Sequence, residues 1–324
     1  MKKIIMFGLI AATVILSGCN KDKVKEPAEA VTDTITIEDE AENREPIIQP
    51  SEETAGNSEP EAKNESETST DDGFSGDFFK DYDPQIEADV KNAIESASSL
   101  QAEIDNVQKV AAKYSLMASK AETQAEMNMA SKWSYTIWDK ELNSLWSRIS
   151  NTADEQTKER LLADQRNWVS MKEEVKLENI GSMEDGGSMY PMNENGFFEG
   201  ITFNRVCILA NELAKIKGET YNMPPRSMYG TYVDDQGSGE VYSSLITRTG
   251  MELDNEALIS IYRLGGIEGT FKEIGDGEYE FVSYGENVKG IIKMNGWENA
   301  SFEVTESADS PFTVGEKFEF DFAF

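Results

Sequence analysis

Residues 123–149 have the sequence TQAEMNMASKWSYTIWDKELNSLWSRI, and this stretch decides the first part of the fold. Thr123 and Glu126 have the spacing of a capping box, in which each side chain binds the backbone N–H of the other residue. Apolar side chains then return every three or four residues, at Met127, Ala130, Ile137, Leu142, Leu145 and Ile149. This period predicts a long helix with one apolar face, which must pack against other helices.

Three more helices are predicted around it. The first follows the Asp83-Pro84 pair, which suits a helix start, and extends to Ala111. The others are expected over residues 154–177 and 199–217, with a loop rich in Gly, Met and acidic residues at 181–196 between them. Four amphipathic helices with mostly short links predict an antiparallel four-helix bundle over residues 83–218.

The period changes to two from Tyr229 onward, which is typical of strands with one buried face. Turn signals such as Gly275-Asp276-Gly277 and Asn295-Gly296 separate several of the strands. Eight strands are expected, at 230–233, 241–247, 258–263, 268–274, 279–284, 288–294, 300–305 and 317–324. They predict a small antiparallel β-barrel or sandwich over residues 226–324. The fold class is therefore α+β and multidomain, with a boundary near Met223-Pro224-Pro225.

The N-terminus has the pattern of an export signal. Lys2 and Lys3 precede the apolar residues 4–16, a run too short to span a bilayer as a mature helix. The run ends in Leu16-Ser17-Gly18-Cys19, which resembles the lipobox of bacterial lipoproteins. The expectation is cleavage of a signal peptide at residues 1–18, lipidation of Cys19 and anchoring to a membrane of the bacterial cell envelope. An ordinary secretory signal with a chance cysteine is the alternative, although Cys207 is the only other cysteine in the chain.

Residues 19–76 are expected to form a disordered acidic tether. Residues 20–72 contain 17 acidic and 5 basic side chains and no aromatic one. Such a composition buries too little apolar surface to offset the entropy of ordering the chain. The tether is predicted to hold the folded part away from the membrane, and no binding site is assigned to it.

Charge and composition restrict the function. The chain has 61 acidic and 30 basic side chains, and removal of residues 1–18 leaves a net charge of −33. This charge argues against nucleic acid as a partner and favours a cationic one. The absence of histidine excludes Ser-His and Cys-His catalysis and imidazole ligation of metals. Acid pairs such as Asp234-Asp235 have no accompanying nucleophile, so we expect no enzyme, no cofactor and no metal site.

An ordered set of motifs runs through the predicted helices. It comprises Thr123-Gln124-Ala125-Glu126-Met127-Asn128, Asp139-Lys140-Glu141-Leu142-Asn143 with Trp146, Leu161, Gln165-Arg166-Asn167-Trp168-Val169, Lys172-Glu173, Gly186-Gly187-Ser188, Thr202 and Arg205. Over about residues 120–217, this set resembles the family of LprI-type lysozyme inhibitors. Met129 and Lys176 stand where the family commonly has cysteines, so its usual cross-link is absent. The resemblance implies inhibition of lysozyme, as in the members that named the family.

Most motif residues can be explained by structure alone. Asp139 and Asn143 are four residues apart and can hydrogen-bond between helices, and Trp168 is large enough to knit a bundle together. The positions expected to be structural are Asp139, Leu142, Asn143, Gln165, Trp168, Thr202 and Arg205. The 181–196 loop is the candidate partner contact, through Met183, Glu184, Asp185, Met189 and Tyr190. A connector without a binding role remains equally open.

The sequence favours a surface-anchored lipoprotein that binds and inhibits a cationic lysozyme, a muramidase, through its acidic helical domain. The alternative is an envelope lipoprotein that binds another protein, a glycan or a small ligand through its β domain. An internal apolar cavity would favour this alternative.

Overall fold

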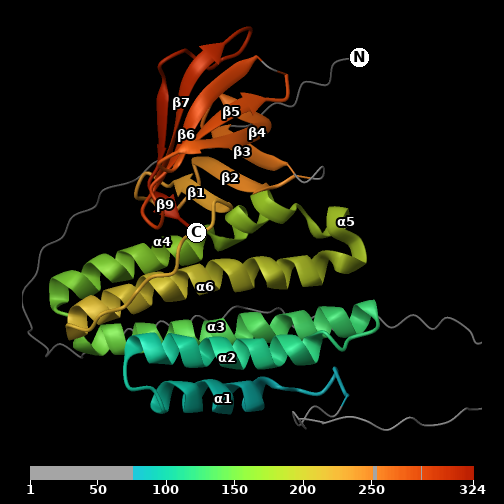
Figure 1. Ribbon diagram of the computed structural model, residues 1–324, viewed down its shortest axis with the longest axis vertical. Coiled ribbons are helices and arrows are strands. Elements are labelled where there is room, and N and C mark those ends of the chain that lie inside the picture. The colour runs from blue at the N-terminus through green and yellow to red at the C-terminus, as the bar shows by residue number, and fades with distance from the viewer. Residues whose placement is uncertain (1–75, 251–253, 286) are drawn as a thin grey trace, which may run out of the picture. The chain divides into compact units, whose positions relative to one another are not determined.

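The computed structural model describes residues 76–250, 254–285 and 287–324 (Figure 1). All of them belong to one unit, Glu59–Phe324. The expected signal peptide, Cys19 and nearly all of the tether lie outside the described residues. None of the described helices has an apolar stretch that would cross a bilayer. The described part is α+β, with helices followed by one antiparallel sheet of nine strands.

Helices occupy the first part of the described chain. They are α1 (Asp83–Glu95), α2 (Leu100–Ala118), α3 (Gln124–Thr152), α4 (Glu155–Ile180), α5 (Met183–Gly186), the short 3₁₀ helix η1 (Gly187–Met189) and α6 (Tyr190–Lys217). The predicted capping box of Thr123 and Glu126 is present at the start of α3. Asp154 caps α4, and Gly218 ends α6 with a φ of 67°, a left-handed conformation that glycine adopts without strain. Local sequence chemistry therefore sets three of these helix ends.

Two predictions for the helices were wrong. The first predicted helix is divided into α1 and α2, because the Ser99 side chain accepts a hydrogen bond from the Ala102 N–H and starts a new helix. The 181–196 loop is mostly helical and contains α5, η1 and the start of α6. Asp185 and Ser182 form a capping box for α5, and Pro191 lies in the first turn of α6, where proline is favoured.

The predicted antiparallel four-helix bundle is corrected in two respects. Its first helix is α1 and α2, and its second and fourth helices, α3 and α6, are direct neighbours that run parallel, whereas neighbouring helices in an antiparallel bundle run in opposite directions (Figure 1). Asn128 in α3 bonds Ser188 just before α6, and further along the two helices the Trp138 and Phe203 rings meet. α4 lies between α3 and α6 in the sequence and runs antiparallel to α6 (Figure 1). α3 also packs against α1 and α2, so it is the central helix of the bundle.

The strands form a nearly closed, up-and-down antiparallel barrel. They are β1 (Gly230–Asp234), β2 (Ser243–Thr249), β3 (Asn255–Ile261), β4 (Gly265–Gly275), β5 (Glu278–Ser283), β6 (Val288–Met294), β7 (Ala300–Ser307), β8 (Lys317–Phe320) and β9 (Phe322–Ala323). Each of the eight predicted strands has a counterpart, and the last is divided at Asp321. β8 pairs with β7 and β9 pairs with β1, so this C-terminal segment joins the two ends of the sheet.

Large side chains occupy the interior of the barrel. Its buried core includes the rings of Tyr232, Phe271, Phe281, Phe302 and Phe320. The Phe281 and Phe302 rings meet edge to face, with 5.5 Å between their centroids. Small barrels are commonly filled in this way, and the filling makes this barrel a packed core among the described residues. It is not the apolar cavity that would favour ligand binding by the β part.

Candidate partner-binding site

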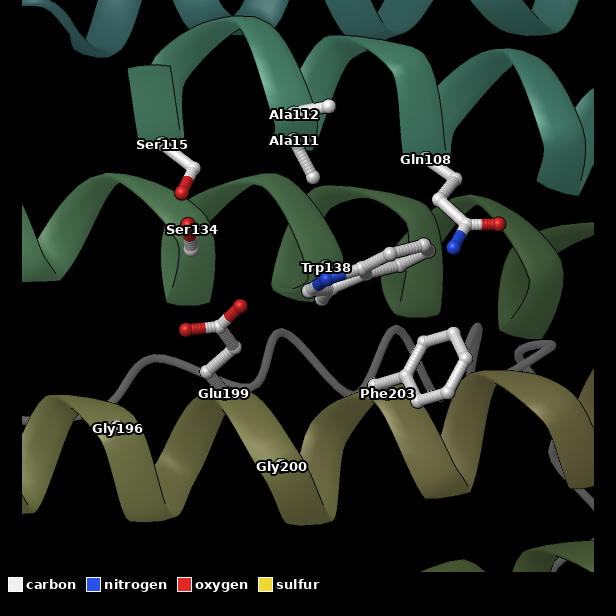
Figure 2. A pocket seen from close by; sticks show the side chains of 10 residues that line it. All are labelled: Gln108, Ala111, Ala112, Ser115, Ser134, Trp138, Gly196, Glu199, Gly200 and Phe203. Carbon is white, nitrogen blue, oxygen red and sulfur yellow. The ribbon is translucent and has the colours of Figure 1, made fainter. Parts of the chain in front are cut away.

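A groove of about 400 Å³ lies where α2, α3 and α6 meet (Figure 2). Its lining residues are Gln108, Ala111, Ala112 and Ser115 of α2, Ser134 and Trp138 of α3, and Gly196, Glu199, Gly200 and Phe203 of α6. α2 and α6 form the two walls, and α3 forms the floor. Small side chains on both walls leave the space open, and a Cβ added at Gly196 or Gly200 would meet no atom within 4 Å.

Two aromatic rings form one end of the groove. The Trp138 and Phe203 rings meet edge to face, with 4.8 Å between their centroids. Trp138 is buried and Phe203 is half-buried, so the pair is held in the bundle while part of it faces the groove. Aromatic surface of this kind binds aliphatic chains and attracts cations to its ring faces.

Among the residues that the structure describes, Glu199 is the only charged one that lines the groove. Its carboxyl group extends from α6 toward Ser134 and Trp138 of α3 (Figure 2). No hydrogen bond or ion pair to Glu199 is found among the described residues, and burial raises the pKa of this carboxyl above its ordinary value. A half-buried carboxylate without a partner gains most from a cationic group.

The predicted contact segment is partly exposed. Met183, Glu184, Asp185 and Met189 are exposed, whereas Tyr190 is buried. Tyr190 packs so closely on Gly186 that a Cβ there would lie 2.8 Å from its ring. Asp185 accepts a hydrogen bond of 2.7 Å from the Ser182 hydroxyl, and this bond lowers the pKa of Asp185. Tyr190 therefore has a packing role, and Asp185 caps a helix.

Exposed methionines gather near this segment. The Asn128 side chain donates a hydrogen bond of 2.9 Å to the Ser188 carbonyl, which brings the start of α3 beside η1. We name the exposed side chains of Met127, Met129, Met183 and Met189 the methionine-rich end. The sequence did not predict the contribution of α3, because Met127 fits the apolar stripe of its helix and Met129 stands where the resemblance implies a cysteine.

Four of the motif residues predicted to be structural lie together, three of them beside the fourth, the buried Arg205. Arg205 donates to the Gln165 side-chain oxygen at 2.7 Å and to the Asp164 carboxylate at 2.6 Å. The Trp168 ring lies 6.0 Å from the Arg205 guanidinium carbon, and Thr202 lies one turn before Arg205 on α6. Burial lowers the pKa of Arg205, while the Asp164 carboxylate opposes this shift. These residues are not available on the surface.

Residues of the β part cover this arginine, which the sequence did not predict. The Phe322 ring lies 6.0 Å from the Arg205 guanidinium carbon, and the Phe324 ring stacks on Trp168 with 6.3 Å between centroids. The Asn204 side chain donates to the Phe324 carbonyl at 3.1 Å. The last residues of the chain are therefore part of the packing around the motif.

The remaining motif positions lie on α3. Leu142 is fully buried in the bundle. The Asn143 side chain donates to the Asp139 carbonyl at 2.9 Å and to the Asp139 carboxylate at 3.1 Å. These two bonds lie within one helix, whereas bonds between helices were expected.

A buried pair of glutamates was also missed by the sequence analysis. Glu141 of α3 is fully buried, and Glu103 of α2 is nearly so. Arg148 binds Glu103 with both ends of its guanidinium and lies 3.6 Å from Glu141. Burial, followed by the neighbouring Glu103, holds the pKa of Glu141 well above its ordinary value, although Arg148 opposes the shift. The spacing of Glu141 and Arg148, two turns apart on one helix, was the available signal.

Metal and thiol chemistry have little support in the described part. Within it, no group of three or more Cys, Asp or Glu side chains could hold a metal ion. Cys207 is a buried free cysteine, and burial raises its pKa to about 11. A buried thiol with a raised pKa is inert as a nucleophile.

Comparison with known proteins agrees with the motifs. No curated protein and no solved structure matches the chain. Residues 117–208 match a family described as "Lysozyme inhibitor LprI", which is a family of inhibitors and not of enzymes. The match runs from the end of α2 into α6 and includes Trp138, Glu199 and Phe203 of the groove. The helical segment 117–208 is therefore similar to the LprI-type domain that this family model describes.

Proposed function

We propose that this protein is a lipid-anchored protein of the bacterial cell envelope whose helical part binds and inhibits a cationic lysozyme. The observation that carries the proposal is the match of residues 117–208 to a family of lysozyme inhibitors. Inhibition would be steric, because the bound helices would block access of the cell-wall substrate to the lysozyme.

The charge of the chain supports a cationic partner. Without residues 1–18 and the acidic segment 20–72, the net charge is still −21. Attraction to a cationic protein would therefore not depend on the tether. Opposite net charges increase the rate of encounter, and this increase falls as salt screens the charges.

The exposed apolar side chains of the helical part support specific docking. The methionine-rich end offers flexible apolar contacts, which are common at protein-binding surfaces. The exposed Glu184 lies in the same segment. Apolar contacts persist at high salt, whereas binding through charge alone is lost when salt screens the charges.

The anchor and the tether belong to the same proposal. Lipidation of Cys19 would hold the chain at the membrane, and a flexible coil of 53 residues spans roughly 40 Å. Repulsion between its acidic side chains would extend it further. The helical part would thus meet lysozyme before the enzyme reaches the envelope.

The test is lysozyme turnover on cell walls at about 0.15 M salt, with residues 20–324 as the inhibitor and an unrelated protein of equal net charge as the control. We expect inhibition by this chain that persists as salt is raised, and none by the control. Equal inhibition by the control, or no inhibition by the chain, would refute the proposal.

A further inference from the structure

The groove between α2 and α6 combines three properties that define a ligand by its chemistry. It has an aromatic wall in Trp138 and Phe203, a carboxylate without a partner in Glu199, and open space beside Gly196 and Gly200. Ligand sites usually have volumes of about 300 to 1,000 Å³. At about 400 Å³ the groove is at the small end of this range and suits one long side chain.

We propose that this groove receives a single lysine or arginine side chain from the surface of a cationic protein. The aliphatic stem would lie on the Trp138 and Phe203 rings, and the charged group would pair with the Glu199 carboxylate. The identity of the cationic protein as a lysozyme rests on the proposed function above, whereas the chemistry of the groove does not.

The lining residues favour a cation over other ligands. An anion would face Glu199 with no basic side chain in the lining to compensate. A purely apolar group would bury the carboxylate further without pairing it, which is costly. A long basic side chain satisfies both the rings and the carboxylate, because its stem is apolar and its end is charged.

The two serines of the groove fit the same ligand. Ser115 on α2 and Ser134 on α3 also line the groove, and in Figure 2 their hydroxyl groups point toward one another. Hydroxyl oxygens accept hydrogen bonds, and guanidinium or ammonium groups offer several N–H donors that one carboxylate cannot fully satisfy. The lining therefore offers hydroxyl acceptors in addition to the Glu199 carboxylate.

The test uses residues 20–324 and small probes in place of the partner. N-acetyl-arginine methylamide and N-acetyl-lysine methylamide are titrated while the indole N–H signal of Trp138 is followed by NMR. Citrulline and norleucine derivatives are the uncharged controls. The Trp138 signal is assigned with the variant Trp138→Phe.

Three variants separate the groove from the rest of the surface. Glu199→Gln removes the carboxylate, and Gly200→Leu fills the open space. Glu159→Gln is the matched control, because it removes an exposed charge on α4 outside the groove. We expect saturable shifts with both cationic probes and binding at least about tenfold weaker in Glu199→Gln and Gly200→Leu, with binding unchanged in Glu159→Gln.

Two results would overturn the inference. One is an equal shift of the Trp138 signal by the uncharged derivatives, and the other is unchanged binding of the cationic probes in both groove variants. The lysozyme assay separates this inference from the proposed function. Cationic probes that bind a chain without inhibitory activity would refute the function and leave the groove assignment standing. Inhibition that is unaffected by both groove variants would refute docking through the groove and leave the function standing.

Discussion

The substitution Glu141→Gln should make the folded protein more stable at neutral pH. Glu141 is fully buried on α3, and neither of its carboxyl oxygens accepts a hydrogen bond from the described part of the chain. Its charged neighbours are Glu103 on α2 and Arg148 on α3, and Tyr221 lies close enough to interact with it electrostatically. Arg148 is already bound to Glu103, so a second negative charge at Glu141 has no partner of its own.

The sign of the pH dependence follows from the raised pKa of Glu141. The unfolded chain releases the proton near the ordinary pKa of 4.5, whereas the folded protein retains it to a higher pH. Below pH 4.5 the carboxyl is protonated in both states, so Glu141 does not lower the free energy of unfolding there. As the pH rises from 4.5 toward the folded-state pKa, the free energy of unfolding decreases. The loss is about 1.4 kcal/mol per pH unit while the folded carboxyl stays protonated. Glutamine has the same shape and does not titrate, so the variant lacks this loss.

Urea unfolding at a series of pH values from 5 to 8 measures the difference directly. The free energy of unfolding of Glu141→Gln, relative to the unsubstituted protein, should increase with pH by about 1.4 kcal/mol per unit before it levels off. Glu103→Gln is the matched control, because it removes the partner of Arg148 and should destabilise by about 1 to 3 kcal/mol. Parallel pH profiles for Glu141→Gln and the unsubstituted protein would contradict a buried, protonated Glu141.

Three further predictions concern the groove, the C-terminus and the anchor. Gly200→Ala should raise the free energy of unfolding by about 0.5 to 1 kcal/mol, because alanine favours the helix and its Cβ meets no atom within 4 Å; a loss of stability in urea unfolding would show that the groove is closed. Deletion of Phe324 should lower the free energy of unfolding by about 3 kcal/mol, because the Phe324 side chain is buried against Trp168. An unchanged melting temperature would show that this contact is not made. Cys19→Ala should abolish incorporation of labelled fatty acid into the chain, and equal labelling would refute lipidation.

The sequence predicted those parts of the fold that depend on neighbouring residues. The predicted capping box at Thr123 acts within one turn of a helix, and it is present. The predicted helix ends at residues 154 and 217 also coincide with local signals, because Asp154 caps α4 and Gly218 ends α6 in a left-handed conformation. The strands were equally predictable from the sequence, because an up-and-down barrel pairs each strand with the next one in the chain. Only the division of the last strand at Asp321 was missed, since it depends on two different partners, β7 and β1.

Two errors arose where another pattern concealed a local signal. The apolar stripe from Ile86 to Ala111 continues across the break at Ser99, so the stripe concealed the cap. Residues 181–196 have the composition of a loop, yet Tyr190 packs on Gly186 and helices form around that contact. The groove was not predictable for a different reason, because its walls come from α2 and α6, which are about 90 residues apart in sequence.

Polar contacts join the helices around Met129 on α3 and Lys176 on α4. By the resemblance of the motifs, these are the two positions where a cross-link would be expected. The Lys176 amine binds Glu194 of α6 at 2.8 Å, and, although burial opposes it, this carboxylate and that of Glu173 raise the pKa of Lys176. The Asn195 side chain donates to the Ser131 hydroxyl at 2.9 Å, which joins α6 to α3 two residues beyond Met129.

These contacts hold α3 and α4 to the same part of α6, the part that also carries Glu199. A disulfide constrains the unfolded chain and requires an oxidising environment, whereas ion pairs and hydrogen bonds of this kind form in either redox state. The position of Glu199 over the groove therefore depends on the packing of α6 against its neighbours and not on a covalent link. The groove is thus a property of the folded helices of this chain, which hold it open through packing, ion pairs and hydrogen bonds.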